Sequence, residues 1–99
     1  MITTQHYNQL TEAESERLEV LAEECSEVIK AVCKIKRHGY ASNNNGALAY
    51  TNRQDLQMEI GHVFAAVDML TVRGDVDMDI INGHKYAKRR SIAKWTHHQ

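Results

Sequence analysis

The chain has 99 residues, of which 42% are hydrophobic and 25% are charged, and it contains five glycines and no proline. This length allows one domain with a small core, so we expect its stability to depend on efficient helix packing or on a partner subunit. The shortage of turn-forming residues disfavours a many-stranded β-sandwich, and a formal net charge of −1 gives no overall field that attracts nucleic acid or an anionic membrane. We therefore predict a single all-α domain over residues 1–99 in which any phosphate recognition is local.

The first predicted helix covers residues 12–38. Thr11 followed by Glu14 has the spacing of a capping box, and apolar residues then recur at helical spacing until Gly39. The centre of the apolar stripe, which we expect to face the core, falls at Leu18, Cys25 and Val32.

The two cysteines, Cys25 and Cys33, lie eight residues apart on this predicted helix. A rise of ~1.5 Å per residue separates them by ~12 Å, which is beyond the reach of a disulfide bond. We expect reduced thiols in the core of a cytoplasmic protein. Residues 1–10 lack the basic and apolar regions of a signal peptide, and Asp68 interrupts the most apolar stretch, so we predict no membrane segment.

Residues 39–52 predict a loop because they are rich in asparagine and glycine and hold no regular apolar spacing. A second helix is predicted over residues 53–73, with Thr51 or Asn52 as its N-terminal cap and Gly74 at its end. Its apolar stripe comprises Leu56, Ile60, Val63, Val67 and Leu70.

A third helix is predicted over residues 77–95, capped by Asp75 or Asp77. Its second half is basic, and Lys85, Lys88 and Arg89 are spaced so that they can share one face. These three cations are candidates for binding phosphate, and they equally fit a solvated basic helix end that the helix dipole favours.

Three carboxylates lie on helix faces that are otherwise apolar. Glu24 falls on an apolar arc of the first helix, with Glu27 at the border of that arc, and Glu59 falls inside the apolar stripe of the second helix. Asp55 and His62 lie four residues before and three residues after Glu59, on the same side of the helix. Because burying an unpaired carboxylate is costly, these acids either pair with lysines across a helix contact or hold a hard divalent cation such as Mg²⁺.

The same residues resemble a known family. The segment LAEECSEVIKAV contains Glu24 and Glu27, and the segment EIGHV begins at Glu59 after a loop. This pattern, over residues 18–70, resembles the MazG-like all-α nucleoside triphosphate pyrophosphohydrolases, whose signature is E-x-x-E, a spacer and E-x-x-D. The resemblance implies a four-helix-bundle type of fold whose core is completed by homo-oligomerisation, as a homodimer or homotetramer. It also implies hydrolysis of a ribo- or deoxyribonucleoside triphosphate to the monophosphate and pyrophosphate, in nucleotide-pool control or house-cleaning.

Within this resemblance, Glu24, Glu27 and Glu59 are the implied catalytic residues and ligands of Mg²⁺, or of Mn²⁺. The last acid of the signature is replaced by His62, and Asp55 is a candidate substitute ligand. Because imidazole is a poor ligand for Mg²⁺ and a better one for Mn²⁺, His62 either shifts the preferred metal, lies outside the ligand set, or marks lost activity. The loop is available as a lid or as a segment that contacts the base.

Aromatic residues that could contact a nucleotide base are few. Tyr40 and Tyr50 bracket the loop and are our candidates for stacking on a base. We expect Phe64 in the core and Trp95 at a subunit or helix contact. An alternative function is a catalytically impaired nucleotide- or metal-binding or regulatory helical protein, and DNA binding is disfavoured by the near-zero net charge.

Overall fold

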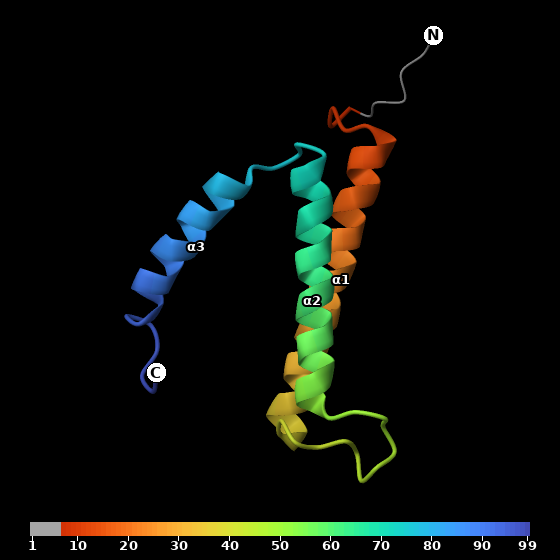
Figure 1. Cartoon of the computed structure of the whole chain (residues 1–99), viewed down its shortest axis with the longest axis vertical. Coiled ribbons are helices and arrows are strands. Elements are labelled where there is room, and N and C mark those ends of the chain that lie inside the picture. The colour runs from red at the N-terminus through yellow and green to blue at the C-terminus, as the bar shows by residue number, and fades with distance from the viewer. Residues whose placement is uncertain (1–6) are drawn as a thin grey trace.

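The computed structural model describes residues 7–99, and within this range it is entirely helical, with no strand. The helices are α1 (Glu12–His38), α2 (Asn52–Val72) and α3 (Met78–Ile92). Helices α1 and α2 run antiparallel and side by side, whereas α3 extends away from them (Figure 1). The predicted all-α class is therefore confirmed, and the unit of tertiary structure in one chain is the α1–α2 hairpin.

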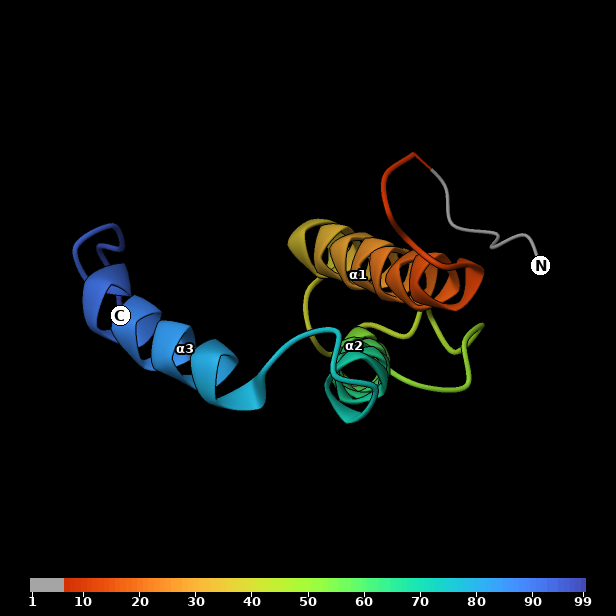
Figure 2. The ribbon, with the colours of Figure 1, turned by 90° about the horizontal axis from the view of Figure 1, so that it is seen from above.

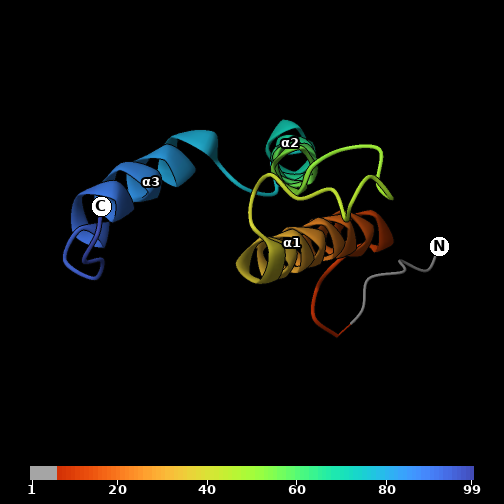
Figure 3. The ribbon, with the colours of Figure 1, turned by 90° about the horizontal axis from the view of Figure 1, so that it is seen from below.

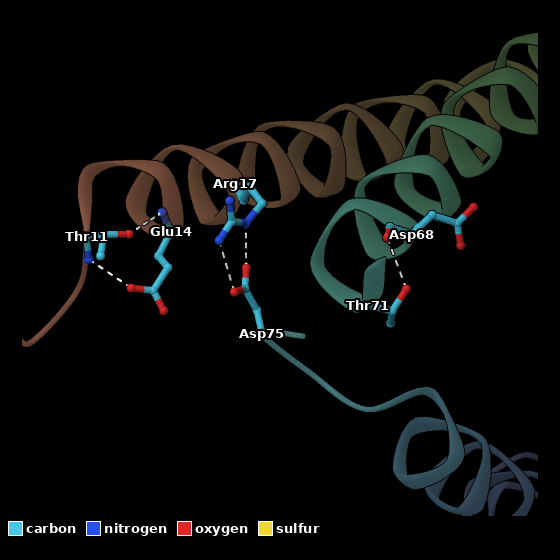
Figure 4. Close-up of polar contacts among 6 residues, drawn as sticks. All are labelled: Thr11, Glu14, Arg17, Asp68, Thr71 and Asp75. Atoms are coloured by element: carbon cyan, nitrogen blue, oxygen red, sulfur yellow. Dashed lines mark hydrogen bonds and ion pairs between the residues drawn. The ribbon is translucent and has the colours of Figure 1, made fainter. Parts of the chain in front are cut away.

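Capping boxes begin the two helices of the hairpin. The Glu14 N–H donates to the Thr11 hydroxyl at 3.1 Å, and the Thr11 N–H donates to the Glu14 carboxylate at 2.9 Å (Figure 4). Thr51 and Gln54 make the same reciprocal pair at the start of α2, with distances of 3.2 and 2.8 Å. Each box satisfies two helix-end donors, so the start of each helix is set by its own sequence.

The third helix is shorter than the sequence predicts. Its cap is Asp77, whose carboxylate accepts a hydrogen bond from the Ile80 N–H at 3.1 Å. The helix ends at Ile92, because the N–H groups of Lys94 and Trp95 bond three residues back, to Ser91 and Ile92, rather than four. The predicted end at residue 95 is thus a tightened turn of the 3₁₀ type.

Small residues form the seam where α1 packs against α2. Ala31 and Ala66 are almost fully buried, and Leu70 is 3% exposed. The absence of long side chains at Ala31 and Ala66 lets the two helix backbones approach closely, which favours this pair of faces as the contact. The seam also carries Glu24 and Glu59, which lie seven residues before each of these alanines.

In the single chain, the α1 residues predicted to face the core are exposed. Leu18 is 42% exposed, Val32 is 43% exposed, and Cys25 is exposed. Both cysteines are free, as their spacing predicts, but they lie at the surface rather than in the core. The reason is that α1 uses the arc around Ala31 for its contact with α2, which turns the more apolar stripe outward.

An apolar face therefore remains open on one side of the hairpin. A shallow depression that both helices line marks its centre, and helical spacing extends it to Leu18 and Val32 on α1 and to Phe64 on α2. The residues of the depression are Cys25, Val28, Ile29, Ile60 and Val63. Phe64, which we expected in the core, is 66% exposed. We call these eight residues the apolar face.

The third helix leaves most of this face uncovered, and it approaches the face only at Phe64, where α2 and α3 line an open hollow. Seen from above and from below, the hairpin is viewed almost end-on and α3 lies to one side of it (Figures 2 and 3). Within residues 7–99, no hydrogen bond or ion pair joins α3 to the hairpin. The radius of gyration is 17.7 Å, against about 13 Å for a compact domain of this length. Trp95, which we expected at a subunit or helix contact, lies beyond the end of α3 and is 77% exposed.

An ion pair fixes the open end of the hairpin. Arg17 on α1 donates two hydrogen bonds to Asp75, just beyond α2, with nitrogen–oxygen distances of 2.6 and 3.0 Å (Figure 4). This hydrogen-bonded guanidinium lowers the pKa of Asp75, and the carboxylate in turn raises the pKa of Arg17. The pair joins segments 58 residues apart in the sequence.

Across residues 7–99, no helix has both the length and the hydropathy that a membrane span requires.

Candidate metal centre

Two glutamates and a histidine meet across the seam of the hairpin. One potential ligand atom from each of Glu24, Glu59 and His62 lies within 4.8 Å of the other two. The His62 Nδ1 atom is 3.5 Å from the Glu24 carboxylate and 3.7 Å from the Glu59 carboxylate. Three of the five predicted ligands are thus brought together, from two helices.

The local sequence explains why these side chains are held at partly covered positions. Glu59 lies one turn before Val63 and two turns before Ala66, within the packed face of α2, and its side chain is only 12% exposed. The side chains of Glu24 and His62 are 26% and 51% exposed. The cluster therefore opens to solvent through His62 and is closed on its inner side by Glu59.

The two His62–carboxylate distances in the cluster fall in the range found between ligands of one divalent cation. The distances of 3.5 and 3.7 Å are too long for hydrogen bonds, so the imidazole does not directly satisfy either carboxylate. Ligand atoms bound to one ion at ~2.1 Å lie about 3.0–4.2 Å from one another, a range that includes both distances. Two carboxylates with one imidazole form a mixed oxygen and nitrogen set, which suits Mn²⁺ or Zn²⁺ at least as well as Mg²⁺.

The other two predicted ligands have lysine partners instead. The Lys30 ammonium donates to the Glu27 carboxylate at 3.2 Å, one turn along α1. The Lys34 Nζ atom lies 3.7 Å from Asp55 across the seam. Glu27 and Asp55 therefore follow the alternative prediction, in which acids pair with lysines. Only the Lys34–Asp55 pair crosses between the two helices.

The predicted phosphate-binding cations of α3 are not at the cluster in the single chain. Lys85 lies over the ring of its neighbour Tyr86, with its Nζ atom 5.1 Å from the ring centre. Lys88 and Arg89 are exposed on a helix that does not pack against α1. The segment after α2 directs α3 away from the hairpin, so the role of these cations in phosphate binding stays a prediction.

The two candidate tyrosines lie at the two ends of the loop and are both exposed. The Arg53 guanidinium lies 4.8 Å from the centre of the Tyr40 ring. This cation–π contact covers one face of the Tyr40 ring. Tyr50 is 43% exposed and retains an uncovered surface.

Sequence reasoning missed a polar cavity beside the loop, to which Lys34 and His38 of α1 contribute. A signal for it was present, because Lys34 and His38 are spaced four residues apart and so share one side of α1 beside the loop.

Comparison of this chain with protein-family models, with curated proteins and with solved structures found no match.

Proposed function

We propose that the protein is a metal-dependent nucleoside triphosphate pyrophosphohydrolase. The observation that carries the proposal is the convergence of Glu24, Glu59 and His62 across the seam of two antiparallel helices. Glu24 and Glu59 occupy acid positions of the E-x-x-E and E-x-x-D pattern, and His62 occupies the position of its last acid. Three of the four signature positions of the MazG-like enzymes thus meet in the cluster. The fourth, Glu27, pairs with Lys30.

In this proposal the cluster residues hold a divalent cation, Mg²⁺ or Mn²⁺. The ion, when bound, offsets phosphate charge and lowers the pKa of a coordinated water. Glu24 and Glu59 would hold this ion beside the α-phosphate, and a carboxylate of the site would accept a proton from the attacking water. A new oxygen–phosphorus bond forms at the α-phosphorus, the α–β anhydride bond breaks, and pyrophosphate leaves.

We further propose that a second copy of the chain covers the apolar face. The chain exposes 8161 Å² of surface, whereas a compact protein of 11.3 kDa exposes about 5,700 Å². The difference is large enough for an obligate interface between subunits. Two hairpins packed through this face make a four-helix bundle. In such a dimer or tetramer, Lys85, Lys88 and Arg89 bind substrate phosphates.

A product analysis tests the proposal. The full-length protein is incubated with each common ribo- and deoxyribonucleoside triphosphate, with Mg²⁺ and separately with Mn²⁺. We expect at least one triphosphate to yield equal amounts of monophosphate and pyrophosphate. Release of inorganic phosphate with a diphosphate product, or no product above a control containing only metal, contradicts the proposal.

A second function has one observation in its favour. His62 stands where the family signature has an acid, and it is half exposed, so the cluster has one anionic ligand fewer than the signature provides. A site with fewer anionic ligands fits a protein that binds metal and nucleotide without hydrolysing the nucleotide. Nucleotide binding that depends on Mn²⁺, combined with no product from any triphosphate, supports this function over the first.

A further inference from the structure

A polar cavity of about 630 Å³ lies where α1 ends and α2 begins. Lys34 and His38 of α1 and Asn52 of α2 form one side of it, and residues of the connecting loop form the other. This volume lies within the usual range for small-molecule sites. No step of the proposed hydrolysis uses this cavity.

Hydrogen bonds tie the loop to the hairpin, so the wall of the cavity is ordered. The Asn52 N–H donates to the Ser42 carbonyl at 2.8 Å, and the Arg53 N–H donates to the Tyr40 carbonyl at 3.0 Å. The Asn52 side chain, which is buried, donates to the Gly39 carbonyl at 3.1 Å. Because the first N–H groups of α2 already donate to loop carbonyls, a ligand in the cavity must be bound by side chains.

Two adjacent asparagines supply free hydrogen-bonding groups to the cavity. Asn44 and Asn45 have φ angles of 56° and 55°, the left-handed region that asparagine tolerates better than most residues. Both residues line the cavity, and their side-chain amides make no hydrogen bond within residues 7–99. The neighbouring Asn43 differs, because its side chain accepts a bond from the Gly46 N–H at 3.0 Å and so holds the loop.

The cavity lies in line with the metal cluster. Asp55 is one turn before Glu59 on the same side of α2, a rise of about 6 Å along the axis. Lys34, one of the residues that line the cavity, has its Nζ atom 3.7 Å from the Asp55 carboxylate. A ligand that extends from Glu59 toward the loop therefore passes the Lys34–Asp55 pair before it reaches Asn44 and Asn45.

The chemistry of the cavity suits a nucleoside better than a polyphosphate. The charge of Lys34 is offset by Asp55, and His38 is the other basic side chain of the lining, so there is no excess of fixed positive charge. Each carboxamide of Asn44 and Asn45 offers both donors and acceptors, as the edge of a base requires. Leu48 adds an apolar wall against which the face of a planar ring can pack.

We propose that this cavity binds the nucleoside part of the triphosphate, with the edge of the base at Asn44 and Asn45 and the phosphate-bearing side toward Lys34. This inference rests on the proposed function, because it uses the metal cluster as the phosphate end of the same substrate. It assigns base recognition to side-chain amides of the loop rather than to Tyr40 or Tyr50.

A double variant, Asn44→Gly with Asn45→Gly, tests the inference. Glycine accepts the left-handed φ angles, whereas alanine would be strained there. We expect KM for the preferred triphosphate to rise about tenfold, because two hydrogen bonds are lost, while kcat stays within about twofold. Competitive inhibition by inorganic tripolyphosphate, which has no nucleoside, should be unchanged. The matched control, Gln57→Ala, removes an exposed amide of α2 and should leave KM unaltered.

A binding measurement separates this inference from the proposed hydrolysis. The ¹⁵N-labelled wild-type protein is titrated with AMP, GMP, CMP, UMP and dTMP without metal, and the side-chain amide signals of Asn44 and Asn45 are followed. Shifts in these signals without any hydrolytic activity would retain the cavity and reject the hydrolase. Hydrolysis with unmoved signals and an unchanged KM in the double variant would reject the cavity alone. Neither shifts nor hydrolysis would reject both.

Discussion

At the scale of single residues, the proposed chemistry depends most on Glu59, the most covered residue of the cluster. Its side chain is 12% exposed and has no lysine or arginine partner within residues 7–99. Glu27 and Asp55, by contrast, each have a lysine within 4.0 Å. A carboxylate at a packed position without a fixed cation is costly unless a mobile cation compensates it. This difference makes Glu59 a stronger candidate ligand than the two acids that pair with lysines.

In the proposed metal site, we expect His62 to set the preference between Mg²⁺ and Mn²⁺. The change His62→Asp replaces an imidazole, which Mg²⁺ binds poorly, with a carboxylate, and it restores the last acid of the family signature. We expect the ratio of Mg²⁺-supported to Mn²⁺-supported hydrolysis to rise severalfold in this variant. Initial rates over a range of each metal measure the ratio. An unchanged ratio would place His62 outside the ligand set.

Part of the site could be predicted from residue positions alone. The helical spacing of Glu24 and Glu59 places them on packed faces whatever the rest of the molecule does, and both are there in the structure. The lysine partner of Asp55 could not be predicted, because it depends on which face α1 turns toward α2. The Glu27–Lys30 pair lies within α1 and follows from its spacing of three residues. The ligand roles of the five residues remain predictions.

At the scale of elements, the seam between α1 and α2 depends on small side chains. The change Ala66→Leu adds three carbon atoms to a position that is 2% exposed, and we expect it to lower the free energy of unfolding by about 1–3 kcal/mol. Urea unfolding at fixed protein concentration measures the loss. The control is Ala65→Leu at the neighbouring exposed position, and equal losses in the two variants would contradict the observed seam.

The Arg17–Asp75 pair predicts a pH dependence of stability. The hydrogen-bonded guanidinium holds the pKa of Asp75 below its ordinary value of 3.8 in the folded chain. A lowered folded-state pKa gives a stabilisation that is complete above about pH 3.8 and is lost as the pH falls through the folded value. The stability difference between wild type and Asp75→Asn should therefore shrink from neutral pH toward about pH 2. A difference that does not change over this range would show that the pair does not contribute through ionisation.

Local sequence determines where each helix starts more closely than it determines which face of the helix is buried. The Thr11–Glu14 box sets the start of α1 where the sequence predicts it, and α2 starts within one residue of its predicted position. The buried face of α1 was predicted incorrectly, because counting apolar residues favours the stripe through Leu18 and Cys25. Close approach at Ala31 decides the contact instead, and that depends on the opposing Ala66 of another helix.

At the scale of the whole molecule, one chain leaves its most apolar surface open and its third helix unpacked. If a second copy covers the apolar face, a charge placed there must weaken assembly, because an uncompensated carboxylate would be buried. We expect Ile29→Glu to shift the wild-type dimer or tetramer to monomer in sedimentation velocity at micromolar concentration. The control Met58→Glu, on the His62 side of α2, should keep the wild-type mass. A monomeric wild type, or an Ile29→Glu variant of unchanged mass, would contradict the proposed interface.

The position of α3 is the feature of the whole molecule that its sequence did not reveal. Its cap and its basic face are local properties, and both can be found from spacing. Its separation from the hairpin is set by residues 73–77, where Gly74 adopts a φ angle of 79° and the Asp75 side chain is held by Arg17. Periodicity within a helix carries no information about such a turn.

The central claim is that the cluster at the seam catalyses pyrophosphate release, and one comparison of variants tests it most directly. Glu59→Gln removes the charge of the most covered ligand, whereas Glu19→Gln removes an exposed charge of α1. With the preferred triphosphate and its metal, the account predicts that pyrophosphate release falls at least about 100-fold in Glu59→Gln and stays within about twofold of wild type in Glu19→Gln. Equal activities of the two variants, with both folded by circular dichroism, would contradict it.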